Sequence, residues 1–183
     1  MLTFTVEIFI DWLYTGKLPQ KSKHWDAGND DLGEYDGVQL AILKACALGD
    51  RLTAPVFRDS VQRVFVRRYT SQAPFYRGVI FAFANFPHDH VLLTMLVDTH
   101  CQEYATEDDT LLDGELAHRS QLPKEFLLRV MLRYSDLRKG KVNDELKPCD
   151  YHGHRSEVER EACQKQDIVE YESDDDLIDE EDK

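Results

Sequence analysis

The stretch AILKACALGDRLTAPVFRDSVQRVFVRR, residues 41–68, predicts two helices joined by a tight corner. Its first half is apolar nearly all round, which is typical of a buried helix. Its second half carries apolar residues at the i, i+4, i+7 and i+8 spacing of a half-buried helix. Pro55 falls in the first turn of that helix, where a missing N–H costs little, and Thr53 is placed to cap it. We therefore expect a helical hairpin on which the rest of the chain packs.

Helical patterns also flank this hairpin. An amphipathic pattern over residues 3–15 ends at Gly16, a common helix stop, shortly before a proline. Further helices are expected downstream over residues 74–84, 90–104 and 122–138. No segment shows the period-two alternation of a half-buried strand. The sequence therefore predicts a mainly α fold, built from a helix, a loop, the hairpin and further packed helices.

The last of these helices carries a strong apolar pattern. Its predicted inner face consists of Phe126, Leu127, Val130, Met131, Tyr134 and Leu137, and its predicted outer face of Arg129, Arg133 and Arg138. Two segments without periodicity, residues 20–37 and 106–121, are predicted to be loops, the first of them mobile.

Charge is distributed unevenly along the chain. The 183 residues include 22 Lys and Arg against 35 Asp and Glu, a net charge of −13, which argues against nucleic-acid or anionic-membrane binding by the chain as a whole. Many of the acids belong to the C-terminal tail, which ends in EYESDDDLIDEEDK. A segment of this composition is expected to be disordered, with one short helix over residues 156–166 before it. We expect the ordered domain to end near residue 140.

The cysteines and the apolar runs bear on the compartment. The four cysteines are Cys46, Cys101, Cys149 and Cys163, and the first two lie within apolar helical patterns. No secretory signal and no apolar run of membrane-spanning length is evident. The expected setting is therefore the reducing interior of the cell, cytoplasm or nucleus, with free thiols and no membrane contact.

Two segments together carry a family resemblance. VEIFIDWLYTGKLP (residues 6–19) followed by ILKACALGDRLTAPVFRDSVQRVF (residues 42–65) resembles the C-terminal half of a BTB/POZ domain. In that family a helix ending in a Tyr-Thr-Gly corner leads through a variable loop to a two-helix hairpin. The region that follows the BTB domain in many fungal proteins is resembled by PFYRGVIFAF (residues 74–83), VLLTMLVDTHC (residues 91–101), LPKEFLLRVMLRYSDLR (residues 122–138) and CDYHGH (residues 149–154).

The resemblance implies an organisation and a function. It assigns residues 1–70 to a partial BTB/POZ-like domain, residues 71–140 to the following helical region and residues 141–183 to a polar tail. The family implies a role in protein–protein interaction, as an adaptor for a cullin-type ubiquitin ligase or in a regulatory assembly. The family's N-terminal strands and helices have no counterpart here, so we expect apolar surface that leads to self-association or needs a protein partner.

The tail holds the best candidate for a chemical site. Cys149, His152, His154 and Cys163 offer two thiolates and two imidazoles, the ligand set of a structural zinc ion. The spacing Cys-x2-His-x-His-x8-Cys matches no standard zinc finger. Two histidines one residue apart can reach one ion only from an extended or turn backbone. The alternative is a disordered segment that happens to hold these four residues.

Candidates for catalysis are few. Asp98, His100 and Cys101 are close in sequence, but neighbours this near on a helix do not face each other. Phosphate-binding, serine-hydrolase and metalloprotease motifs are not found. The sequence therefore predicts a non-catalytic protein–protein interaction module, with no cofactor apart from the candidate zinc. The alternative is a small zinc-binding regulatory protein that uses the Cys/His segment.

Overall fold

The computed structural model describes residues 2–25, 34–106, 115–141, 146–154 and 156–163. Its elements in chain order are α1 (Leu2–Thr15), η1 (Ser22–His24), α2 (Glu34–Arg51), α3 (Pro55–Tyr69), α4 (Tyr76–Asn85), α5 (Val91–Glu103), α7 (Glu115–Arg119), α8 (Lys124–Arg138) and η2 (Pro148–Asp150). Residues 157–163 form a further short helix. No strand occurs within the described ranges, and the predicted mainly α fold is confirmed.

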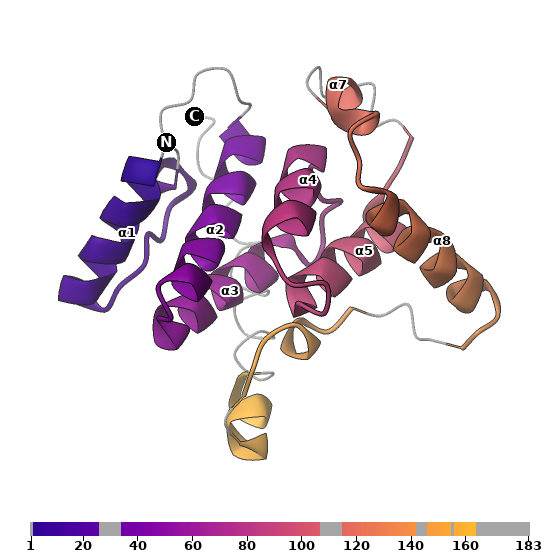
Figure 1. Cartoon of the computed structure of the whole chain (residues 1–183). Coiled ribbons are helices and arrows are strands. Elements are labelled where there is room, and N and C mark those ends of the chain that lie inside the picture. Colours follow the sequence, from indigo (N-terminus) through magenta and orange to yellow (C-terminus); the bar gives the residue numbers. More distant parts are fainter. Residues whose placement is uncertain (1, 26–33, 107–114, 142–145, 155, 164–183) are drawn as a thin grey trace, which may run out of the picture.

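The predicted hairpin forms the centre of the molecule. In Figure 1, α1, α2 and α4 stand side by side, while α3 and α5 cross behind them. Ile42, Leu43 and Cys46 on α2 are fully buried, since α2 is covered by α1, α3 and α4. A helix that is apolar nearly all round is stable in such a position because most of its surface meets another element, and only the stripe with Lys44 and Leu48 stays half-exposed.

The corner between α2 and α3 differs from the prediction in one detail. Ala54 precedes α3 as its N-cap, and no side chain caps the helix. Thr53 instead adopts a positive φ of 51°, and its hydroxyl donates a hydrogen bond to the Leu52 carbonyl. Thr53 forms the turn between the two helices, so its side chain does not cap α3. The backbone N–H of Ala54 donates a hydrogen bond to the Gly49 carbonyl of α2.

The close approach of α2 and α3 depends on Gly49. A Cβ atom on this glycine would lie 2.9 Å from the Cβ and 3.0 Å from the Cα of Arg58 on α3. Gly49→Ala should gain about 1 kcal/mol in helix propensity but lose more through overpacking, a net loss of about 1–2 kcal/mol in the free energy of unfolding. Urea unfolding would measure it. Gly153→Ala, where the added Cβ has nothing within 4 Å, is the matched control. An unchanged midpoint for Gly49→Ala would contradict the tight crossing.

One core crosses the boundaries expected near residues 70 and 140. The largest cluster of buried apolar residues draws on α1 to α5 and also includes Tyr151. Segments 1–70 and 71–140 therefore share a core, and the packed part of the chain continues beyond residue 140. The acidic tail, residues 164–183, lies outside the described residues.

Both segments predicted to be loops contain regular structure. In the first, Trp25 is fully buried and its indole Nε1 donates to the Pro19 carbonyl over 2.9 Å, which attaches η1 to the core. Residues 26–33 lie outside the described residues, and α2 begins at Glu34, earlier than expected. In the second, α7 occupies part of the expected loop, while residues 107–114 are outside the described ranges.

The orientation predicted for the last helix is confirmed for Phe126, Val130 and Leu137 and wrong for the other three residues of the predicted inner face. α8 lies at the edge of the molecule and packs mainly on α5 (Figure 1). Phe126 is fully buried, but Leu127, Met131 and Tyr134 are exposed. Arg133, predicted to point outward, faces the core. Apolar residues occupy too wide an arc of this helix for periodicity alone to choose the buried side.

Candidate functional site

The outer side of α8 carries a continuous apolar surface. We define the α8 outer surface as the side chains of Leu127, Leu128, Met131, Leu132 and Tyr134, which are 44–60% exposed. At 100° per residue these side chains span roughly 160° of the helix circumference. α5 packs on the opposite side of α8, so these apolar side chains remain exposed.

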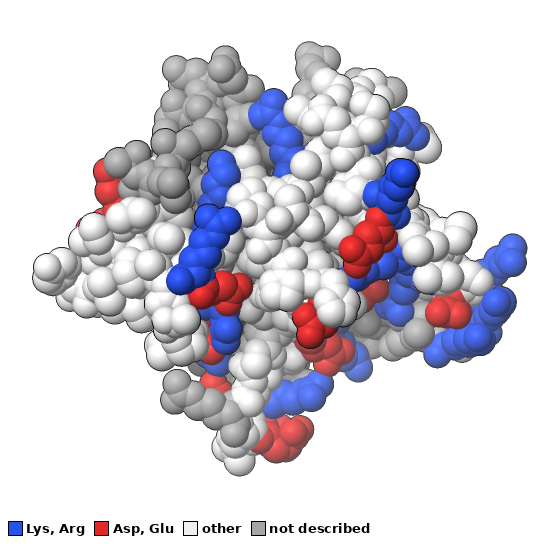
Figure 2. All heavy atoms as spheres, in the orientation of Figure 1, with Lys and Arg blue, Asp and Glu red and all other residues white. Residues whose placement is uncertain are grey.

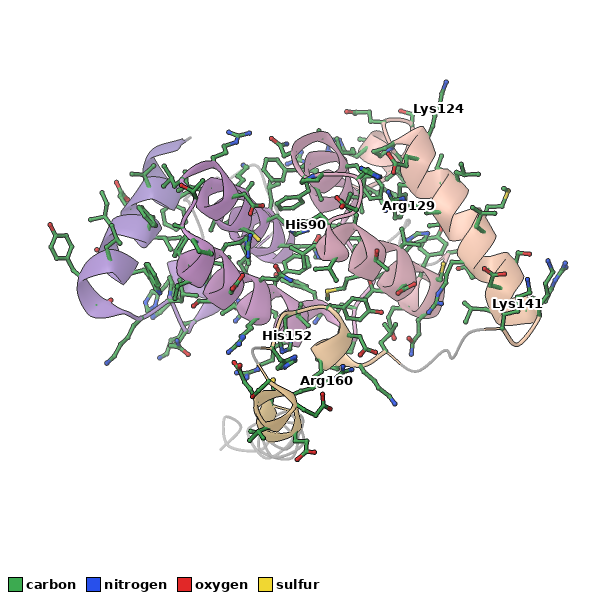
Figure 3. The ribbon with its side chains drawn as sticks, turned by 60° about the horizontal axis from the view of Figure 1, so that its bottom comes forward. His90, Lys124, Arg129, Lys141, His152 and Arg160 are labelled. Atoms are coloured by element: carbon green, nitrogen blue, oxygen red, sulfur yellow. The ribbon has the colours of Figure 1, made fainter. Side chains whose placement is uncertain are left out.

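Positive charges border this surface. Lys124 and Lys141 project outward beyond the two ends of α8 in Figure 3. Arg138, Lys139 and Lys141 are exposed at the end of the helix, where Lys141 pairs with the Asp136 carboxylate at 3.7 Å. Figure 2 shows Lys and Arg atoms gathered at the same edge of the molecule. The α8 outer surface is therefore apolar with basic ends, although the chain as a whole is acidic.

The inner side of α8 is fixed by a buried polar network. The Arg133 guanidinium forms an ion pair with the Asp98 carboxylate of α5, with 2.7 Å between nitrogen and oxygen. The Tyr151 hydroxyl donates to the other oxygen of Asp98 over 2.8 Å. Burial raises the pKa of Asp98 above its usual range, against the opposing effects of the Tyr151 hydrogen bond and of Arg133. This network joins α5, α8 and the C-terminal segment.

The four residues predicted to bind zinc come together. One ligand atom from each of Cys149, His152, His154 and Cys163 can be chosen so that all lie within 4.8 Å of one another. His152 Nε2 lies 3.2 Å from the Cys163 sulfur, and the rings of His152 and His154 have centroids 4.5 Å apart. All four cysteines of the chain are free thiols, and Cys149 is buried. Cys46 and Cys101 are not members of this cluster.

Local backbone structure explains how the cluster forms. The 3-10 turn η2 presents Cys149, and the bends that follow it place both histidines on the same side. The short helix 157–163 returns Cys163 to them. Arg160 on this helix forms an ion pair with Asp150 of η2 over 2.7 Å, and this contact joins the two ends of the segment (Figure 3). The non-helical backbone required for two histidines one residue apart is present.

The segment carrying the cluster is attached to α3. Gln62 Nε2 donates to the Tyr151 carbonyl over 2.7 Å in a buried hydrogen bond. Arg63 forms an ion pair with Glu159 over 2.7 Å. Both contacts link residues almost a hundred positions apart, so tertiary packing places the segment on the core. The apolar residues Leu146 and Tyr151, which precede the acidic run, were the signals in the sequence that could have indicated this packing.

The sequence neighbours Asp98, His100 and Cys101 form no catalytic arrangement. The Cys101 thiol contacts the Val130 carbonyl at 3.8 Å, and burial raises its pKa to about 11. The His100 ring stacks on Tyr104 at a centroid distance of 4.6 Å. A nucleophilic cysteine needs a lowered pKa and a base within hydrogen-bond reach. Cys101 has the opposite shift.

A separate cavity of about 370 Å³ opens where α1, α2 and α4 meet. Its wall is formed by Thr5, Lys44, Ala47, Leu48, Arg51, Phe81 and Asn85. The ionisable side chains in this wall are both cationic, so no acid–base pair converges there. The cavity offers apolar contact with a basic rim rather than a site for proton transfer.

Comparison of the chain with protein-family models, with curated proteins and with solved structures finds no match. The resemblance to the BTB/POZ family gains no support from these comparisons and stays a prediction. None of the helices in the described ranges combines the length and the apolar character needed to cross a membrane.

Proposed function

We propose that this chain is a non-catalytic protein–protein interaction module that binds its partner through the α8 outer surface. The observation that supports the proposal is the row of exposed apolar side chains on α8. A contiguous apolar patch of this kind on a soluble domain usually marks an interaction site. The α8 outer surface runs from Leu127 to Tyr134, about 12 Å along the helix axis, which is enough for about two turns of a partner helix.

The occupant we propose is an amphipathic helix of another protein, with acidic side chains beside its apolar stripe. An apolar stripe matches Leu128, Met131 and Leu132, which are displayed along one side of α8. Acidic flanks match Lys124 and the basic residues after Arg138 at the two ends of the surface. Complementary charge of this kind fixes orientation and raises the association rate, while apolar burial supplies most of the affinity.

The remaining features of the chain support a binding role over a catalytic one. The thiol of Cys101 is deactivated by burial, and the cavity beside α2 lacks an acid–base pair. Bridging to a cullin-type scaffold is a narrower proposal, which rests only on the BTB resemblance. The resemblance would place the scaffold contacts of this narrower proposal in residues 74–104 and not on α8.

Two synthetic helical peptides test the proposed partner chemistry. Both carry the same leucine stripe, but one has glutamates and the other lysines at the flanking positions. The full chain should bind the glutamate peptide at least about tenfold more tightly, as measured by fluorescence anisotropy, and added salt should reduce this preference. The double variant Met131→Gln/Leu132→Gln should weaken binding by about tenfold or more, since full burial of each apolar side chain contributes roughly 1.5–3 kcal/mol to the binding free energy.

Leu13→Gln is the matched control for this experiment. Leu13 is exposed on α1 to an extent similar to Met131, so the same loss of apolar surface there should leave peptide binding unchanged. Equal binding of the two peptides, or an equal effect of the control, would contradict the proposal. Sedimentation of the chain alone tests the rival occupant. A dimer that the Met131→Gln/Leu132→Gln change dissociates would make a second copy of the chain the partner.

A further inference from the structure

We propose that Cys149, His152, His154 and Cys163 bind one structural zinc ion, which fastens the C-terminal segment to the helical core. The inference is independent of the α8 outer surface. It rests on donor chemistry, on the separations of the donors and on the way in which the segment is attached to α3.

The donor set suits zinc better than other common metals. Two sulfur and two imidazole donors form a tetrahedral S2N2 site, and zinc binds this set in closed structural sites without a bound substrate. Two thiolates balance the charge of a divalent cation, so the occupied site adds no net charge to the interior. Oxygen donors, which magnesium and calcium require, are not part of the cluster.

The separations require only small movements for binding. In a tetrahedral site with zinc–sulfur bonds of about 2.3 Å and zinc–nitrogen bonds of about 2.0–2.1 Å, neighbouring donor atoms are about 3.3–3.8 Å apart. The four donors here lie within 4.8 Å of one another, and the pair His152–Cys163 is already at 3.2 Å. Side-chain movements of about 1 Å would bring all four donor atoms to the separations of a tetrahedral site.

A buried nitrogen of the cluster also points to a ligand. Nε2 of His154 is buried and has no hydrogen-bond partner among the described residues. A buried polar atom without a partner costs free energy, and a metal bond to this nitrogen would remove that cost. The polar groups that face the cluster from α3 include Arg63, which is engaged by Glu159.

The proposed ion would have a structural role. It would join the two ends of the segment 149–163, in which Cys149 and Tyr151 are the buried residues among those that the structure describes. A polar segment with so little apolar burial gains order from a metal, because the ordered site does not exist in the unfolded chain. Holding Tyr151 in place would also preserve its hydrogen bond to Asp98.

Metal analysis of the full chain tests the proposal. Protein purified under reducing conditions and dialysed against a weak chelator should retain about one zinc per chain. Replacement of zinc by cobalt(II) should give the intense visible bands and the thiolate charge-transfer bands of tetrahedral cobalt. A strong chelator should speed tryptic cleavage after Arg160, which lies between His154 and Cys163, and added zinc should restore protection.

Cys163→Ser should lower zinc affinity about a hundredfold or more, because one of four ligand bonds is lost. Cys101→Ser, a thiol outside the cluster, is the matched control and should retain zinc fully. The cobalt spectrum of the wild-type chain gives a result even if the Cys163→Ser chain does not fold. Metal-free protein, cobalt bands without thiolate character, zinc retention unaffected by Cys163→Ser, or a Cys149–Cys163 disulfide in reduced preparations would each overturn the assignment.

Discussion

Phe57→Ala is expected to lower the free energy of unfolding by about 3–5 kcal/mol, the largest stability change among the substitutions considered. Phe57 is fully buried at the start of α3, where it supports α1. Its ring meets Phe9 edge to face at a centroid distance of 5.0 Å and lies 5.2 Å from the ring of Trp12. Truncation removes the apolar burial and these aromatic contacts, and leaves a cavity beneath α1.

Urea unfolding followed by far-UV circular dichroism measures this loss. Tyr14→Ala is the matched control, since Tyr14 is an aromatic residue on α1 with 87% of its surface exposed. We expect this control to change stability by no more than about 0.5 kcal/mol. A loss below about 1 kcal/mol for Phe57→Ala would mean that α1 does not pack on α3 as the structure has it.

Asp98→Ala is expected to cost about 3 kcal/mol of stability, the second largest effect. The substitution leaves the Arg133 guanidinium without the carboxylate that it meets at 2.7 Å, and the Tyr151 hydroxyl without its acceptor. Removal of one member of a buried ion pair typically costs about 3–5 kcal/mol. We place the loss at the lower end because 21% of the Arg133 side chain is exposed and water can reach it.

A double variant separates the ion pair from simple loss of packing. In Asp98→Ala/Arg133→Met no charge is left buried, so this chain should be more stable than Asp98→Ala alone. Asp59→Ala is the control, because Asp59 pairs with Arg58 at the surface, where such pairs contribute little. Additive losses in the double variant would show that Asp98 and Arg133 are not energetically coupled.

Local sequence patterns predicted several features of this molecule without reference to the fold. The all-round apolar character of residues 41–52 predicted a buried central helix, and α2 is buried apart from a half-exposed stripe with Leu40, Lys44 and Leu48. Pro55 predicted the start of α3, because proline fits the first turn of a helix. The Cys/His set was identified from residue type alone, since thiolates and imidazoles are the donors that zinc prefers. The two helix predictions are confirmed because each depends on neighbours in sequence, whereas zinc binding by the Cys/His set stays a prediction.

Tertiary structure decided the features that depend on distant neighbours. Which side of α8 is buried was settled by Asp98 on α5, which pairs with Arg133 and leaves Met131 in solvent. A wide apolar arc satisfies more than one orientation, so the pattern could not choose. The meeting of Cys149 and Cys163 likewise depends on contacts of their segment with α3. The sequence determined which elements form and which donors are present, whereas long-range packing determined which surfaces are exposed and which donors meet.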